Sequence, residues 1–250
     1  MNKQIKNFGF IEPEIVPEDF WLGSGKLGSI VLNEKGDWRE WLPIMEKQNQ
    51  GNETSCCVSF GTLSALEILH KFHFETEPNY SDRFLCKMSD TDNGNTPKKV
   101  ADTARHSGCV PEKEYPFVIP LDEFFQDIPQ KLIDMGIDWL KDFEVGYEYT
   151  TKEQLKEALK RSPVGVAVSA WEQNDKGEYV YFGTWNHWCV LVAYDEQDRP
   201  IIWDSYDAGL KTLVKDYNFG FPQIYTLNKK KEEKRSWWQR FINWIKSLFV

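Results

Sequence analysis

The sequence lacks the features of several large protein classes. It contains no apolar run as long as the roughly 18 residues that mark a transmembrane helix. Its amino terminus has no apolar core of the kind found in secretory signal peptides, which predicts a cytoplasmic protein. The net charge is −9, and no basic stripe runs through the body of the chain. That charge argues against a general nucleic-acid binder.

Cysteine and histidine are both scarce, with five of the first and four of the second. The cysteines are scattered along the chain at Cys56, Cys57, Cys86, Cys109 and Cys189. An odd, scattered set without a signal peptide predicts free thiols in a reducing compartment. No second pair of ligands has the spacing of a zinc site, so we expect neither a metal nor another cofactor.

The hydrophobic pattern changes from helical to extended along the chain. Apolar residues make up 41% of the sequence, enough for a substantial core. Helical patterns cover 55–73, 97–106, parts of 121–143, and a surface stretch near 152–162. Short alternating runs follow at 163–170, 178–183, 188–195, 199–205, 210–216 and 222–227. This segregation predicts an α+β protein with two lobes and a cleft between them.

Two adjacent cysteines stand at the start of the helix expected over 55–73. Thr54 or Ser55 is suited to cap that helix, which would place Cys56 in its first turn. A thiolate is stabilised at the positive end of a helix, so Cys56 is a candidate nucleophile. Adjacent cysteines also suggest metal or redox chemistry, so the rest of the chain has to decide.

Partners for such a nucleophile lie on two consecutive strands. His187 opens one strand and Asp204 ends the next, and both follow Cys56 by roughly 130 to 150 residues. Taken alone, His187 lies close to two tryptophans in the sequence and would suit a structural role. Beside the Asp204 carboxylate, its ring would be oriented to act as a base. Gln50, in the loop before Cys56, offers an amide donor for an oxyanion. The four residues together predict acyl-transfer chemistry.

Six segments in order resemble the papain-like cysteine peptidases (papain and cathepsin type). DWREWLPIMEKQNQGNETSCCVSF resembles the family's DWR…NQGxCGSCWAF opening, and NGNTP (93–97) is similar to CNGGxP. The others are EYPF (114–117), SPVGVAVSA (162–170), NHWCVLVAY (186–194) and IIWDSYDAG (201–209). The resemblance covers about residues 37–227 and implies the papain-like fold, with a helical lobe and an antiparallel β-barrel-like lobe, about 37–120 and 160–227. Residues 1–36 are then an amino-terminal arm.

The resemblance also implies a function and a set of site residues. It implies a cysteine peptidase acting on peptides or proteins, with Cys56 as nucleophile, Cys57 as a small buried neighbour and Gln50 as oxyanion donor. His187 and Asp204 complete the triad. The residues it implies along the substrate cleft are Gly94, Asn95, Ala167, Asn186 and Tyr206.

Several positions depart from the family pattern. Asp204 stands where the family has asparagine, so the resemblance implies that Asp204→Asn keeps substantial activity. Tyr206 replaces a shielding tryptophan, Cys57 replaces an aromatic residue, and neither family disulfide can be completed. The arm is much shorter than the family's inhibitory propeptide, so activation by its removal is not expected. Short, leaderless chains of this kind suggest a bacterial or phage source.

The last residues, 228–250, form a separate segment by composition. Seven lysines and arginines lie from Lys229 onward, and aromatic and aliphatic residues recur at helical spacing over the last 14 or so. Such a helix would be roughly 21 Å long, too short for a bilayer core of about 30 Å. The pattern predicts an amphipathic helix that docks on a membrane surface or on protein.

Two other readings remain open from the sequence. One is another Cys–His–Asp acyl-transfer enzyme, such as an amidase acting on cell-wall peptides or a transglutaminase-like protein. The other is a catalytically silent papain-like binding module, tethered by its carboxyl-terminal helix. A peptide electrophile that reacts only with an activated thiol would separate the silent module from an enzyme.

Overall fold

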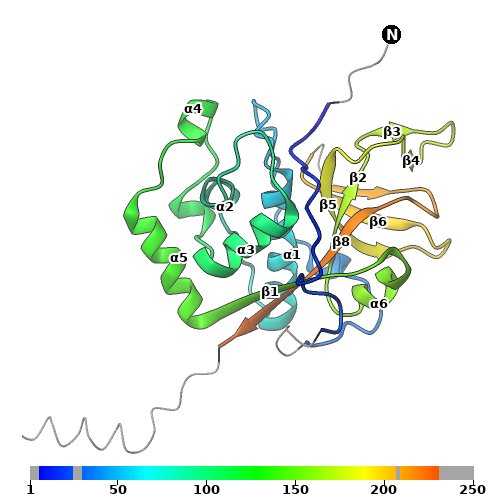
Figure 1. The fold of residues 1–250 in the computed structure, drawn as a ribbon, viewed down its shortest axis with the longest axis horizontal. Coiled ribbons are helices and arrows are strands. Elements are labelled where there is room, and N and C mark those ends of the chain that lie inside the picture. Colours follow the sequence, from blue (N-terminus) through cyan, green and yellow to red (C-terminus); the bar gives the residue numbers. More distant parts are fainter. Residues whose placement is uncertain (1–5, 25–29, 207–208, 231–250) are drawn as a thin grey trace, which may run out of the picture.

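The structure is a computed structural model that describes residues 6–24, 30–206 and 209–230. Most helices gather on one side of the molecule and most strands on the other (Figure 1). The expected division into a helical and a β lobe is therefore confirmed. None of the helices in these ranges is both long and apolar enough to cross a membrane.

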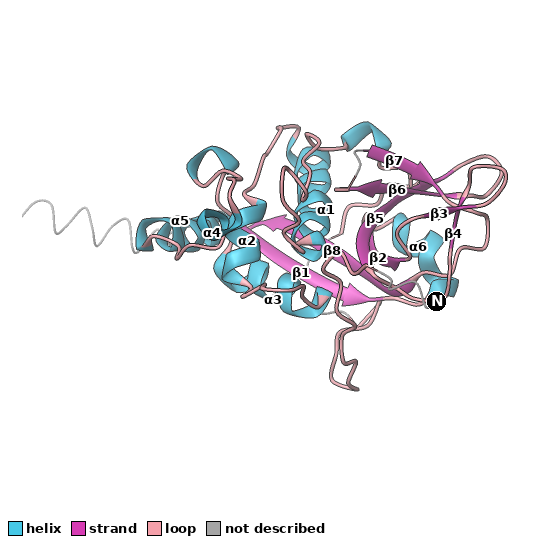
Figure 2. Cartoon of the chain, turned by 90° about the horizontal axis from the view of Figure 1, so that it is seen from above, coloured by secondary structure: helices cyan, strands magenta, loops and turns pink. Residues whose placement is uncertain are grey.

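Among the described helices the longest is α1 (Cys57–Phe74), which lies between the two lobes (Figure 2). It contacts α2 and α3 on one side and β5 and β8 on the other, which explains why most of its first three turns are buried. The helix begins after Cys56, which is its N-cap residue but makes no side-chain capping hydrogen bond. The cap expected at Thr54 or Ser55 is thus wrong by one or two residues, and Cys57 occupies the first helical position.

Five further α-helices follow in the described residues. Ser81 caps α2 by accepting a hydrogen bond from Phe84 N at 3.0 Å, and Thr96 caps α3 from Lys99 N at 3.2 Å. The helices are α2 (Asp82–Met88), α3 (Pro97–Ser107), α4 (Leu121–Phe124), α5 (Gln130–Asp142) and α6 (Leu155–Leu159). Single 3₁₀ turns cover Arg39–Trp41, Glu112–Glu114 and Lys152–Gln154.

A six-stranded antiparallel sheet forms the core of the β lobe. Its strands are β1 (Phe143–Tyr149), β2 (Val164–Val168), β5 (His187–Tyr194), β6 (Pro200–Asp204), β7 (Gly209–Thr212) and β8 (Gly220–Lys229). Their order in the sheet is β1-β8-β2-β5-β6-β7. A separate two-stranded ribbon joins β3 (Glu172–Gln173) and β4 (Tyr179–Val180).

Two boundaries differ from the sequence-based expectation. Residues 143–149 form β1, which was not predicted because the helical pattern was carried on to Phe143. Its partner β8 runs to Lys229, which pairs with Phe143, so the sheet extends past the predicted boundary at 228. The predicted amphipathic helix falls on 231–250, outside the described residues.

Candidate active site

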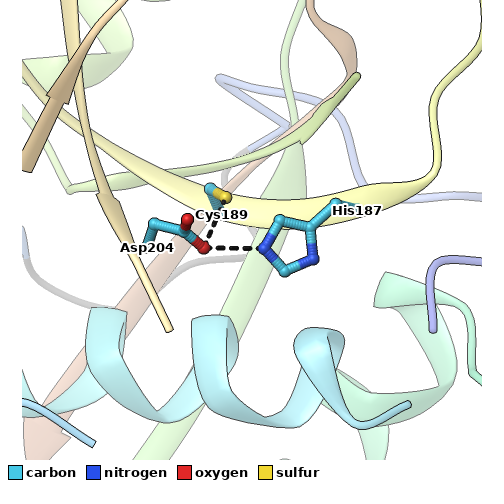
Figure 3. A group of neighbouring side chains, drawn as sticks. All are labelled: His187, Cys189 and Asp204. Carbon is cyan, nitrogen blue, oxygen red and sulfur yellow. Dashed lines mark hydrogen bonds and ion pairs between the residues drawn. The ribbon is translucent and has the colours of Figure 1, made fainter. Parts of the chain in front are cut away.

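His187 and Asp204 meet at the ends of two paired strands. His187 begins β5, Asp204 ends β6, and the two strands are antiparallel neighbours. His187 Nε2 lies 2.7 Å from Asp204 Oδ1, and neither side chain is exposed (Figure 3). The structure thus brings together the two residues that the sequence placed on adjacent strands.

The Asp204 carboxylate receives hydrogen bonds on both of its oxygens. Tyr206 N donates to Oδ1 at 3.0 Å, while Trp171 Nε1 and Lys211 Nζ donate to Oδ2 at 3.1 and 2.6 Å. Burial by itself would raise the pKa of Asp204, but the interactions with His187 and Lys211 outweigh it and lower the pKa. The carboxylate is therefore ionised at neutral pH.

Cys189 lies two residues along β5 from His187. Its Sγ is 3.5 Å from Asp204 Oδ1, and potential ligand atoms of the three side chains all lie within 4.8 Å of one another. This cluster has the composition of a Cys–His–Asp triad. Burial raises the pKa of the Cys189 thiol well above its usual range, so the thiol stays protonated. Because the Lys211 ammonium already neutralises the carboxylate, we do not assign the cluster as a cation site.

The second ring nitrogen of His187 points away from Asp204 and Cys189 (Figure 3). This atom, Nδ1, is buried and makes no hydrogen bond to any described residue. Aromatic rings surround the imidazole edge-on, with centroids 5.4 Å away for Phe8, and 6.0 Å for both Trp171 and Tyr206. Tyr206 thus shields the pair at the position where the family carries tryptophan.

The structure corrects the prediction for Cys56. Its sulfur is bonded to Cys86 of α2, and the Cα atoms are 6.0 Å apart, within the usual range for a disulfide. The side chain packs with Phe60 and Phe124 on the side of α1 that faces the helical lobe. A disulfide sulfur cannot act as a thiolate, so Cys56 is not a free nucleophile here. The expectation that all five cysteines are free thiols is wrong for this pair.

Cys57 lies on the other face of α1. It is completely buried, and its thiol receives a hydrogen bond from the backbone of Trp188, the residue after His187. One turn later on the same face, a Cβ added to Gly61 would lie 2.7 Å from Trp188 Cδ1. Burial raises the pKa of the Cys57 thiol, and the Trp188 hydrogen bond offsets only part of that. The free cysteine at the helix start therefore packs against the beginning of β5.

Gln48, two residues before the predicted Gln50, is the buried glutamine of this loop. Gln48 is fully buried, and its Oε1 accepts a hydrogen bond from Ser205 Oγ at 3.1 Å. Its Nε2 donates to Glu53 Oε1 at 2.8 Å and to Phe8 O at 2.9 Å. Gln50 is exposed on the loop. Backbone pairing of Gln48 N with Ser205 O at 3.1 Å fixes Gln48 beside the end of β6.

The amino-terminal arm crosses this site. Phe8 N donates to Asn186 O at 2.8 Å, and Asn186 Nδ2 donates to Lys6 O at 2.7 Å. The Phe8 ring lies over His187, and its centroid is 4.7 Å from that of Tyr206. The arm therefore places the Phe8 ring against the imidazole. It also occupies the carbonyl oxygen of Asn186, the residue before His187.

The same segment also pairs with the helical lobe. Asn95 N donates to Gly9 O at 2.8 Å, and Ile11 N donates to Asn95 O at 3.0 Å. A Cβ added to Gly94 would lie only 2.7 Å from Gly9 O, so the approach of the two backbones needs a glycine there.

Phe10 completes the contact between the arm and the site. Its ring is parallel to that of Trp188, with centroids 5.8 Å apart, and Trp188 pairs with Ala167 on β2. Four of the predicted cleft residues lie against the arm, namely Gly94, Asn95, Asn186 and Tyr206, whereas the fifth, Ala167, lies opposite Trp188 on β2. The arm was expected to be too short for an inhibitory propeptide, yet its contacts occupy the candidate site.

One signal in the sequence distinguishes the two adjacent cysteines. On a helix, Cys57 shares a face with Gly61 and Ala65, whereas Cys56 shares one with Phe60. Small residues at four-residue spacing allow close approach of a strand, and the structure packs that face against β5. The spacing in the family motif predicted Cys56, because Cys56 follows Gln50 by the number of residues that separates the glutamine and the cysteine in that motif.

The chain is similar to known proteins in both sequence and structure. The family model described as papain family cysteine protease matches residues 32–206. Among curated proteins, no match to the sequence was found.

Several solved structures share the fold. Xylellain, a cysteine protease from Xylella fastidiosa, has a TM-score of 0.66 at 14% identity, covering 90% of this chain and 98% of that one. Procathepsin L 3 from the larval midgut of Tenebrio molitor has a TM-score of 0.60 at 16% identity, with 83% and 73% covered. Bromelain from Ananas comosus, in complex with the E64 inhibitor, has a TM-score of 0.53 at 15% identity, with 78% and 98% covered. At such identities the likeness establishes the fold alone.

Proposed function

Because this chain belongs to the papain family of cysteine proteases, we propose that it hydrolyses peptide bonds with Cys57 as the nucleophile. His187 acts as general base and acid, and Asp204 orients its ring. Gln48 donates a hydrogen bond to the oxyanion. This assignment keeps the two strand residues expected from the sequence and replaces Cys56 and Gln50.

The observation that carries the proposal is the state of the His187 ring. Nε2 is held by Asp204 at 2.7 Å, whereas Nδ1 is buried without a hydrogen-bond partner among the described residues. A buried polar atom without a partner is costly, and active sites are where such cost is tolerated. Nδ1 is thus the nitrogen that is available to take a proton from a thiol.

Among the cysteines, Cys57 fits this requirement best. Cys56 is bonded to Cys86, and Cys189 contacts the same carboxylate oxygen that already holds Nε2. Cys57 is at the positive end of an 18-residue helix and packs beside the backbone of Trp188.

The first half of the reaction forms an acyl-enzyme. The Cys57 thiol gives its proton to His187 Nδ1, and the thiolate forms a bond to the carbonyl carbon of the substrate. The oxygen takes up the electron pair and is held by Gln48 Nε2 and the free backbone N–H of Cys57 in the first helical turn. The carbon–nitrogen bond then breaks, and the leaving amine takes the proton from His187.

The second half releases the acyl group. His187 removes a proton from water, the resulting hydroxide attacks the thioester carbon, and the carbon–sulfur bond breaks. Protonation of the departing thiolate by the imidazolium restores Cys57. Throughout both halves of the reaction, Asp204 accepts a hydrogen bond from Nε2–H of His187 and keeps the ring in one orientation.

One contact of the arm supports the role proposed for Gln48. Phe8 O accepts a hydrogen bond from Gln48 Nε2 at 2.9 Å, so the proposed oxyanion donor already binds a peptide oxygen. The same contacts exclude a substrate, because the arm occupies Asn95 and Asn186. We therefore propose that the arm closes the site and that hydrolysis requires its displacement.

Thiol-directed peptide epoxide labelling, followed by mass spectrometry of the adduct, tests the assignment. The variants are Cys56→Ala, Cys57→Ala and Cys189→Ala in the full chain, each measured with and without reductant. We expect the adduct on Cys57, loss of labelling and hydrolysis in Cys57→Ala, and retention of both in Cys189→Ala. An adduct on Cys56 under reducing conditions, with Cys57→Ala still active, would restore the register predicted from the sequence.

One observation favours a second function, that of a silent binding module. Cys57 is fully buried, and burial raises its pKa, so the described state is unreactive. The same labelling carried out on Gly9→Ala, a variant designed to release the arm, separates the two functions. An open site that binds peptide but never labels would identify the silent module.

A further inference from the structure

The third residue of the site carries a charge that the family's asparagine lacks. Asp204 and His187 are both completely buried, and a buried carboxylate is costly unless a cation pairs with it. Lys211 supplies such a cation, with Nζ 2.6 Å from Asp204 Oδ2.

The register of the sheet explains why Lys211 reaches this carboxylate. In the β6–β7 pair, Lys211 lies opposite Ile202, and Asp204 lies two residues further along β6 on the same face. A diagonal neighbour is within reach of a long side chain, so the lysine extends along the sheet to Oδ2.

Lys211 is itself enclosed. Its side chain is only 7% exposed, and Nζ also donates to Tyr206 O at 3.0 Å. The ammonium lies 5.2 Å from the ring centroid of Trp171 and 5.9 Å from that of Tyr179, which adds favourable cation–π contacts. A lysine buried with this set of partners is fitted to the carboxylate, unlike the exposed lysines of the surface.

We propose that Lys211 is a positioning residue that cancels the charge of Asp204 and aims Oδ1 at His187. The Asp204–Lys211 pair then presents to the imidazole a neutral acceptor, as an asparagine would. The inference rests on the proposed function of His187 and Asp204. It also changes one expectation from the sequence, because Asp204→Asn alone leaves an ammonium buried without its counter-ion.

The other titratable groups near the imidazole add no net charge to that of the Asp204–Lys211 pair. Glu53 and Lys6 form their own ion pair at 3.1 Å, so their charges offset each other. Burial raises the pKa of both the Cys57 and Cys189 thiols, which keeps them uncharged. Tyr206 contributes a phenol that accepts from Lys6 Nζ at 3.0 Å. The charges that decide the state of His187 are therefore those of Asp204 and Lys211.

Charge-removal variants test the proposal. The set is Lys211→Met, Lys211→Arg, Asp204→Asn and the double variant Asp204→Asn/Lys211→Met. Lys215→Met is the matched control, because Lys215 is 59% exposed and pairs at 3.8 Å with a surface carboxylate. NMR titration of the His187 ring in the full chain gives a readout that needs no activity, and the pH profile of kcat/KM gives a second.

The expected shifts have opposite signs. Lys211→Met leaves an uncompensated negative charge that favours the imidazolium, so the midpoint of the ring titration should rise by about one to two pH units. Asp204→Asn should lower it by a similar amount, and the double variant and Lys211→Arg should lie near wild type. The acid limb of kcat/KM should follow the same order, because the proposed base is the neutral imidazole. We expect a loss of about tenfold or more in each single Met or Asn variant and recovery in the double variant.

Two results would overturn the proposal. One is a His187 midpoint that is the same in Lys211→Met, Lys215→Met and wild type; the other is a double variant that is no closer to wild type than Asp204→Asn. If Lys211→Met does not fold, the double variant and Lys211→Arg decide in its place, since neither buries an unpaired charge. Absence of hydrolysis and labelling in the wild type would instead reject the proposed function, while the NMR midpoints still decide the role of Lys211.

Discussion

Gly9→Ala is expected to open the site without altering any residue of the proposed machinery. Gly9 has a φ of +112°, and a Cβ placed on it would lie 1.9 Å from Ser55 O and 2.3 Å from Ser55 C. Both atoms are backbone, so no side-chain rotation can relieve the collision. The arm has to move away from the loop before α1, and its contacts with Asn95 and the Gln48 amide are then lost.

The size of the effect follows from this geometry. A non-glycine residue in such a backbone conformation costs about 1–3 kcal/mol, and the collision adds to that cost. Taking about 2–3 kcal/mol for the closed state alone, the ratio of open to closed molecules rises roughly 30- to 150-fold. The rate of Cys57 labelling should rise by the same factor as long as the closed form dominates, because only the open form reacts.

The assay is the second-order rate of epoxide labelling, measured on wild type, Gly9→Ala and Gly23→Ala. Gly23 lies in the same arm with a φ of +85°, and no atom lies within 4 Å of its added Cβ. It therefore has a comparable backbone cost without the collision at the site. Equal rates in wild type and Gly9→Ala, or equal acceleration by Gly23→Ala, would refute the reasoning.

Two further predictions concern stability and the tail. Burial raises the pKa of Glu112 to about 7 from a usual value of 4.5, so its contribution to stability is lost as pH rises between these values. The melting temperature of Glu112→Gln, relative to wild type, should therefore increase from pH 5 to pH 8; a constant difference would contradict this. Deleting residues 231–250 should leave peptide hydrolysis unchanged and abolish co-sedimentation with anionic vesicles, which high salt should weaken in the full chain. If the full chain does not co-sediment, the tail does not bind lipid.

The sequence predicted those parts of the site that depend on local order along the β lobe. His187 begins one strand and Asp204 ends the next, so a hairpin-like pairing of neighbouring strands is enough to bring them together. Apolar residues run almost without interruption along both strands, because β5 and β6 are each buried over most of their length.

Other parts depend on contacts between distant segments. The Cys56–Cys86 disulfide joins the start of α1 to α2, and nothing in either segment alone indicates that pairing. Whether Gln48 or Gln50 is buried depends on the path of the loop, in which Ser55 has a φ of 55°. Lys211 could not be found from a motif, because its role follows from a diagonal position across two strands.

The position of β8 has a consequence for how the protein is made. β8 is the last strand of the described chain, yet it lies inside the sheet between β1 and β2. A nascent chain leaving the ribosome therefore carries both neighbours, unpaired along that edge, until residues 220–229 have emerged. Since β2 supports β5 and with it His187, the proposed site is completed only after β8 has joined the sheet. The order of translation thus delays completion of the sheet beside the proposed site until the last of its strands has been made.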